Sequence, residues 1–143
     1  MKRVTALMIG LLGLAPLASA AESSYQLVAH ASTPGSQIRR DVVRAIFLGE
    51  ATRWADGTQV RPIDQSLRSQ LRARFCESAL GHSVSENGAY WHQRVSSARV
   101  FPPPVKTSDD DVIAFVRGNK GAIGYVSGEV TVGDDVKVLK IVD

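Results

Sequence analysis

Residues 64–69 of this chain carry side chains that could bind a small anion. Gln65, Ser66, Arg68 and Ser69 precede a run of apolar residues spaced by four, which predicts the start of a helix. Amide, hydroxyl and guanidinium groups donate hydrogen bonds, and the free N–H groups of a helix start favour negative charge. The segment therefore predicts an oxyanion site. Ordinary N-capping by Ser66 among solvated arginines is the other interpretation of the same residues.

Two further segments have the same polar character. Ser32 and Thr33 follow a predicted strand at residues 25–29, and ligands of open α/β sheets bind at the carboxyl ends of strands. Residues 106–108, Lys-Thr-Ser, precede another predicted helix. Each segment is also typical of a turn or cap that serves the following helix, and local sequence alone favours that interpretation. We take Ser32 and Thr33 as additional candidate ligands of the same anion.

The sequence lacks the patterns expected of a catalytic or metal site. Its three histidines are far apart, and it contains no Gly-x-Ser-x-Gly, His-Glu-x-x-His or Gly-x-x-x-x-Gly-Lys-Ser/Thr motif. Cys76 is the only cysteine, which excludes an intrachain disulfide, and its helical setting beside Phe75 predicts a partly buried, inert thiol. We expect a protein that is not an enzyme and that uses no metal and no cofactor.

Residues 1–20 have the three-part pattern of a secretory signal peptide. Lys2 and Arg3 precede an apolar stretch, and Ala18-Ser19-Ala20 forms a small-residue cleavage site. A membrane anchor is the alternative, but the apolar stretch is short for a span of about 20 residues. Cleavage after Ala20 leaves residues 21–143, which is 143 − 20 = 123 residues and enough for a single domain.

The charge balance does not favour functions that depend on a strongly basic or strongly acidic protein surface. The chain has 17 basic and 14 acidic residues, a net charge of +3, and loss of Lys2 and Arg3 reduces it to 15 − 14 = +1. A nearly neutral domain gives no indication of nucleic-acid binding or of an acidic membrane surface as partner. We expect a soluble periplasmic protein that does not insert into the membrane after cleavage.

Strands and helices alternate along the rest of the chain. Predicted strands occupy residues 25–29, 60–63, 121–126 and 136–142, and predicted helices begin near Ser36, Ser66, Ser83 and Ser108. Ile38, Val42 and Ile46 give the first helix an apolar stripe, and Gly49 ends it. Such alternation predicts an α/β domain of three layers, with a mostly parallel sheet and helices on both faces. The last two strands are expected to pair antiparallel at one side.

Two motifs resemble those of a known family. Ile46-Phe47-Leu48-Gly49, followed by Arg53-Trp54 and Asp56-Gly57, resembles the IFLGKI-x-x-W signature of phosphate ABC-transporter substrate-binding proteins. Residues 121–126, Gly-Ala-Ile-Gly-Tyr-Val, are identical to a second family motif. The resemblance covers nearly all of residues 21–143. It implies the fold of one lobe of a type II periplasmic binding protein, because full-length members have two lobes and are about twice as long or more.

The resemblance implies a ligand, but this chain differs from the family in the pocket loop. Family members carry an Arg and a Ser-Gly-Thr run before the corresponding helix, whereas this chain carries over only the hydroxyl of Ser66, with Arg68 one turn later. We therefore expect an exported solute-binding-like module for phosphate or a similar small oxyanion, serving ABC-type uptake. Its partners would be an ABC permease, a sensor protein or a second copy of the chain. The alternative is a periplasmic sensor or protein-interaction domain that has lost transport-type ligand binding. Trp54 is expected to pack under the sheet edge, away from a ligand.

Overall fold

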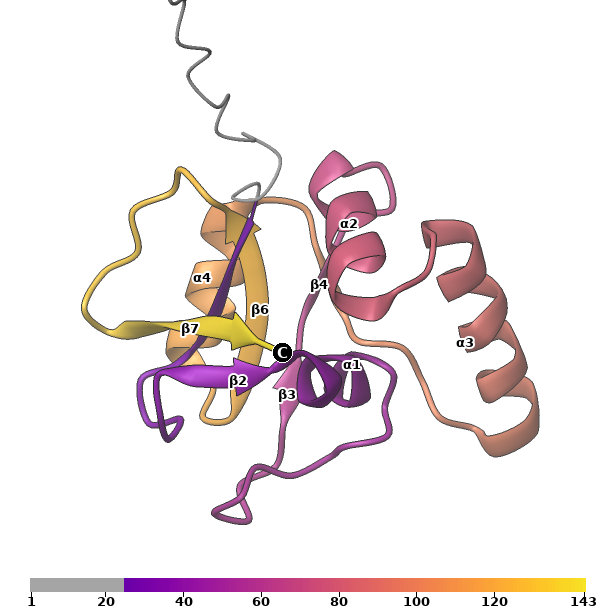
Figure 1. The fold of residues 1–143 in the computed structure, drawn as a ribbon, viewed down its shortest axis with the longest axis horizontal. Helices are drawn as coiled ribbons and strands as arrows, with labels where there is room; N and C mark the ends of the chain where they lie inside the picture. Colours follow the sequence, from indigo (N-terminus) through magenta and orange to yellow (C-terminus); the bar gives the residue numbers. More distant parts are fainter. Residues whose placement is uncertain (1–24) are drawn as a thin grey trace, which may run out of the picture.

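The computed structural model describes residues 25–143 (Figure 1). The signal-peptide prediction for residues 1–20 lies outside these residues. The elements in chain order are β1 (Tyr25–His30), β2 (Gln37–Arg39), α1 (Arg40–Phe47), β3 (Arg61–Pro62), β4 (Asp64–Gln65), α2 (Gln70–Phe75), the π-helical turn η1 (Cys76–Leu80), α3 (Val84–Ala98), β5 (Val105–Lys106), α4 (Asp109–Gly118), β6 (Ala122–Ser127) and β7 (Val136–Val142). None of the helices in residues 25–143 is long and apolar enough to cross a membrane.

Five strands form the main sheet in the order β2-β7-β1-β6-β3, and β4 pairs with β5. The pairs β2–β7, β3–β6 and β4–β5 are parallel, and only the central strand β1 runs against its neighbours. The expectation that the last two strands pair with each other is wrong, because β6 and β7 lie on opposite sides of β1. An apolar strand such as β1 is suited to this interior position, where both of its faces are covered.

Helices cover both faces of the sheet, as the alternation of strands and helices predicts. On one face, Leu27 and Ala29 pack with Phe47 of α1 and Phe75 of α2. On the other face, Val28 and residues of β6 pack against the inner side of α4. Successive side chains of a strand point to opposite faces, so β1 alone supplies both cores. The three-layer α/β architecture is therefore confirmed.

The first helix starts later than its apolar spacing predicts. Ile38 lies in β2 opposite Ile141, α1 begins only at Arg40, and Ser36 is not its N-cap. Val42 is 39% exposed, and the buried face of α1 consists of Val43, Ile46 and Phe47. Pairing with β7 keeps residues 37–39 extended. This is a long-range effect, and the spacing of apolar residues along the sequence cannot predict it.

Capping residues and glycines behave largely as predicted. Ser83 and Ser108 are N-caps whose side chains accept hydrogen bonds from the N–H groups three residues later, at 3.1 Å in both helices. Gly49 follows the end of α1 with a φ of 73°, a left-handed conformation that glycine adopts without strain. Trp54 is half-buried and donates from its indole nitrogen to the carbonyl oxygen of Gly121 at 3.0 Å, so it packs beside the edge strand β3 as expected.

Candidate functional site

Two helix starts lie side by side at one edge of the sheet. β3 and β4 follow β6 in the same direction, since Ile63 donates to Ile123 and the side chain of Gln65 donates to Tyr125. The parallel partner of β4 is β5, and each of the two leads directly into a helix, α2 and α4 respectively. The carboxyl ends of parallel strands are where α/β folds place their ligands.

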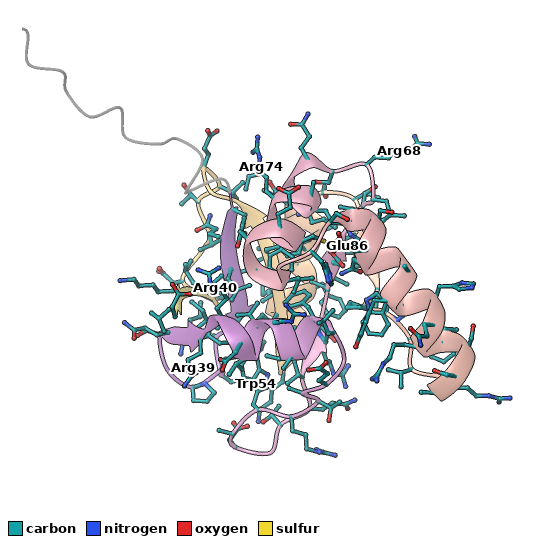
Figure 2. All side chains as sticks on the ribbon, turned by 45° about the vertical axis from the view of Figure 1, so that its right-hand side comes forward. Arg39, Arg40, Trp54, Arg68, Arg74 and Glu86 are labelled. Carbon is teal, nitrogen blue, oxygen red and sulfur yellow. The ribbon has the colours of Figure 1, made fainter. Side chains whose placement is uncertain are left out.

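The loop between β4 and α2 presents polar groups at this edge. The hydroxyl of Ser66 accepts a hydrogen bond from the backbone of Arg68 at 3.3 Å, and the carbonyl of Ser66 accepts from the backbone of Ser69 at 2.9 Å. Ser69, and not Ser66, is the N-cap of α2, and its hydroxyl makes no capping hydrogen bond. Arg68 is exposed and points outward from the loop (Figure 2). The structure thus brings Ser66, Arg68 and Ser69 together on one turn.

Gln65 lies beneath this turn and its amide hydrogens are already committed. Its Nε2 donates to the carboxylate of Asp109 at 3.0 Å and to the carbonyl oxygen of Tyr125 at 3.1 Å. The side chain is only 4% exposed. Gln65 therefore links β4 to α4 and β6, and in this state both of its amide donors are withheld from a ligand.

A buried ion pair that the sequence did not reveal lies under the same loop. Asp64 and Arg72 approach to 3.3 Å with exposures of 5% and 7%, and Arg72 also donates to the carbonyl of Gln65 at 2.9 Å. The hydroxyl of Tyr125 donates to the second carboxylate oxygen of Asp64. Burial and the neighbouring Asp64 raise the pKa of Tyr125, which keeps this hydroxyl protonated.

Arg72 lies off the line formed by Leu67, Leu71 and Phe75, yet its side chain is buried. It stands three positions before Phe75 and four before Cys76, and side chains at these spacings share a helix face. That spacing is the signal that could have indicated its burial. Cys76 is fully buried rather than partly buried, and burial raises the pKa of its thiol, in keeping with an inert role.

Ser32 and Thr33 lie at the opposite end of the sheet from Ser66. Along β1, Tyr25 faces Ser127 near the β4 loop, whereas His30 faces Val136 beside the Ser32 turn. The five residue steps between them span about 17 Å. The structure therefore does not bring Ser32 and Thr33 to the anion candidate formed by Ser66, Arg68 and Ser69.

Local contacts account for the Ser32 turn. The Ser32 hydroxyl is 2.7 Å from Nδ1 of His30, and Thr33 is buried, with its carbonyl accepting from the ammonium of Lys137. Lys137 also donates to the carbonyl of Gly35 at 2.8 Å. The turn joins β1 to β2 and is held by groups of its own surroundings.

Charges at the β4–β5 edge are mixed. Lys106 is the register partner of Gln65, and Arg68 lies on the adjacent turn. Asp109 stands between the two helix starts and accepts from Gln65 and from the backbone of Ser127 at 3.3 Å. An anion at this edge would meet the cations Arg68 and Lys106, Asp110 and Asp111 on the first turn of α4, and the fixed carboxylate of Asp109. That carboxylate opposes a fully ionised ligand but can accept a hydrogen bond from a protonated one.

Comparisons with known proteins identify relatives of this fold. No family model matches the chain, and no curated protein does. Solved structures do match. One is a phosphate-bound structure from Clostridium perfringens that is described as a phosphate ABC transporter substrate-binding protein. It matches this chain with a TM-score of 0.65 and 20% sequence identity. An ABC-type phosphate transport receptor from Vibrio cholerae matches with a TM-score of 0.62 and 21% sequence identity. PstS from Borrelia burgdorferi matches with a TM-score of 0.63 and 13% sequence identity.

The matches are partial in a consistent way. Each covers 82% of this chain but only 44%, 46% and 47% of the three relatives, so the chain spans less than half of their length. It has the fold of one lobe of a phosphate-binding substrate-binding protein.

Proposed function

We propose that the chain is an exported solute-binding module that takes a small oxyanion, most simply phosphate, at the start of α2. The observation that carries the proposal is that β4 and β5 deliver two helix starts to one sheet edge, in a fold shared with phosphate-binding proteins. Ser66, Ser69 and Arg68 would donate to the anion, together with the free backbone N–H groups of the first helical turn. Ser32, Thr33 and Gln65 are not part of this refined proposal.

The lone lobe should bind weakly. Arg68 is exposed, and in water a charge pair at 4 Å is worth only about 1 kcal/mol. A total near 4 kcal/mol corresponds to a dissociation constant of roughly 1 mM. Tighter binding would need a second wall that excludes water. We propose that a periplasmic partner supplies it, either an ABC permease, a sensor protein or a second copy of the chain.

Calorimetry of residues 21–143 with phosphate and with sulfate tests the proposal. Wild type should bind phosphate in the millimolar range, and the double variant Ser66→Ala with Arg68→Ala should lose this binding. Ser32→Ala is the matched control and should bind as wild type does, because Ser32 lies at the other end of β1. Absence of heat at millimolar phosphate, for the monomer and for any dimer, would sink the proposal.

One observation favours a second candidate function, that of a protein-interaction or sensor domain. The loop before α2 lacks the arginine and the Ser-Gly-Thr run of the family that the chain resembles, and the amide of Gln65 is used within the fold. Such a domain would bind its partner elsewhere, and that binding would survive the Ser66→Ala and Arg68→Ala substitutions.

A further inference from the structure

Strand β7 changes partners halfway along its length. Its first half pairs antiparallel with β1, from Val136 opposite His30 to Leu139 opposite Leu27. Its second half pairs with β2 instead, where Lys140, Ile141 and Val142 face residues 37–39. In the register of residues 25–143, Tyr25 and Gln26 have partners in β6 but none in β7. Beyond the Leu27–Leu139 pair the two strands diverge, and β7 continues beside β2 (Figure 1).

A cavity lies in this split, among residues 25–143. It has a volume of about 930 Å³, within the range of ligand-binding clefts, and it is lined by Tyr25–Leu27 on one side and Val138–Ile141 on the other. Glu77 and Ser78 of η1 also line this cavity. We call this cavity the β1–β7 slot. Of its four β7 residues, Val138 and Leu139 pair with β1, whereas Lys140 and Ile141 pair only with β2.

Apolar groups line the slot and basic groups surround it. Leu27, Leu139 and Ile141 belong to the apolar core cluster beneath the slot. Arg74 and Lys140 border it, and Arg44 lines the adjoining smaller cavity of about 350 Å³. Arg74 and Lys140 have no ion-pair partner among residues 25–143, and Glu77 is the one acidic residue that lines the slot, which leaves 2 − 1 = +1.

The remaining charges around the slot are already paired. Arg40 lies 2.6 Å from Asp143, and Arg39 lies 2.9 Å from Asp41. Figure 2 shows Arg74 at the upper end of this side of the molecule and Arg40 lower down. An occupant with negative charge would therefore meet Arg74 and Lys140 as its counter-charges.

We propose that the β1–β7 slot binds an extended acidic segment of a partner protein as an added strand. Exposed strand edges accept such segments through main-chain hydrogen bonds, and alternate side chains then point into pockets and out toward the rim. Apolar residues of the segment would face Leu27, Leu139 and Ile141, and carboxylates would face Arg74 and Lys140. The proposal does not depend on the oxyanion site, which lies at the β4–β5 edge.

The test uses residues 21–143 and a labelled ten-residue peptide in which Val alternates with Glu, measured by fluorescence anisotropy. The acidic peptide should bind, and binding should weaken as salt is raised. A matched peptide with Lys in place of Glu should bind at least about tenfold more weakly. Each exposed charge contact contributes little by itself, but the peptide reverses several of them at once, and their binding free energies add up. A third peptide, N-methylated at alternate residues, lacks the N–H groups of one edge and should not bind.

Two charge-reversal variants locate the binding. Arg74→Glu with Lys140→Glu should weaken the acidic peptide by about tenfold. Arg53→Glu with Lys120→Glu changes the net charge equally at a distance and should bind as wild type does. Circular dichroism of both variants checks that the fold is retained.

Three results would each overturn the proposal. These are equal affinity for the acidic and basic peptides, unchanged binding of the N-methylated peptide, and equal loss in the two charge-reversal variants. A self-association that the acidic peptide displaces would also overturn it, since the occupant would then be a second copy. Phosphate binding can fail or succeed independently of all these outcomes, because Ser66, Arg68 and Ser69 remain unchanged.

Discussion

Replacing Arg72 by Met should destabilise the fold through the charge that it leaves behind. Asp64 is 5% exposed and would keep only the hydroxyl of Tyr125 and its local backbone contact, while the carbonyl of Gln65 would lose its 2.9 Å donor. Breaking a buried ion pair in this way costs about 3–5 kcal/mol. That is a large part of a typical stability of roughly 5–15 kcal/mol.

The assay is equilibrium urea unfolding followed by tryptophan fluorescence, with Trp54 and Trp91 as the probes. Asp64→Asn is the companion variant, and it should retain an acceptor for Tyr125. The double variant should lose at least about 1 kcal/mol less unfolding free energy than the sum of the losses in the two single variants, because the two charges act as a pair. An Arg72→Met variant within about 1 kcal/mol of wild type, or strictly additive costs, would refute the reasoning.

Three further predictions concern the same structure. A Cβ on Gly124 would lie 2.5 Å from Ile63 and 2.9 Å from Val112, so Gly124→Ala should cost about 1–3 kcal/mol in urea unfolding, and a neutral effect would contradict this. Because the pKa of Tyr125 is raised in the folded state, its contribution to stability is fully present below about pH 10 and is lost as the pH rises further. The decline of unfolding free energy above pH 10 should therefore be shallower in Tyr125→Phe, and parallel curves would argue against it. Ser108→Ala removes an N-cap and should lower the midpoint of thermal unfolding, for a cost of about 1 kcal/mol.

Local signals in the sequence predicted much of the fold. The capping serines at 83 and 108, the glycine after α1 and the apolar strand at 122–127 appear in the structure at or near their expected positions. Each depends on residues within one or two turns of chain. The resemblance of two motifs to a known family added the arrangement of these elements, which no local pattern contains.

Features that depend on distant pairing could not be predicted in the same way. Residues 37–39 continue the helical spacing of α1 but become a strand because β7 pairs with them. Ser32 and Thr33 were predicted to join the anion site because they follow the end of a strand. That strand, β1, runs antiparallel to β6, so its end lies at the opposite side of the sheet from Ser66. That single reversal separates Ser32 from Ser66. The spacing of Arg72 to Phe75 and Cys76 can indicate its burial, but its pairing with Asp64 depends on another element and could not be predicted.

The most direct measurement of the central claim is a phosphate titration of isotopically labelled residues 21–143 followed by amide NMR. The amides of Ser69, Gln70 and Leu71 should shift at millimolar phosphate, while those of Ser32 and Thr33 should not. The shifts should vanish in the Ser66→Ala and Arg68→Ala double variant. Shifts confined to the Ser32 turn, or none at millimolar phosphate, would contradict an oxyanion site at the start of α2.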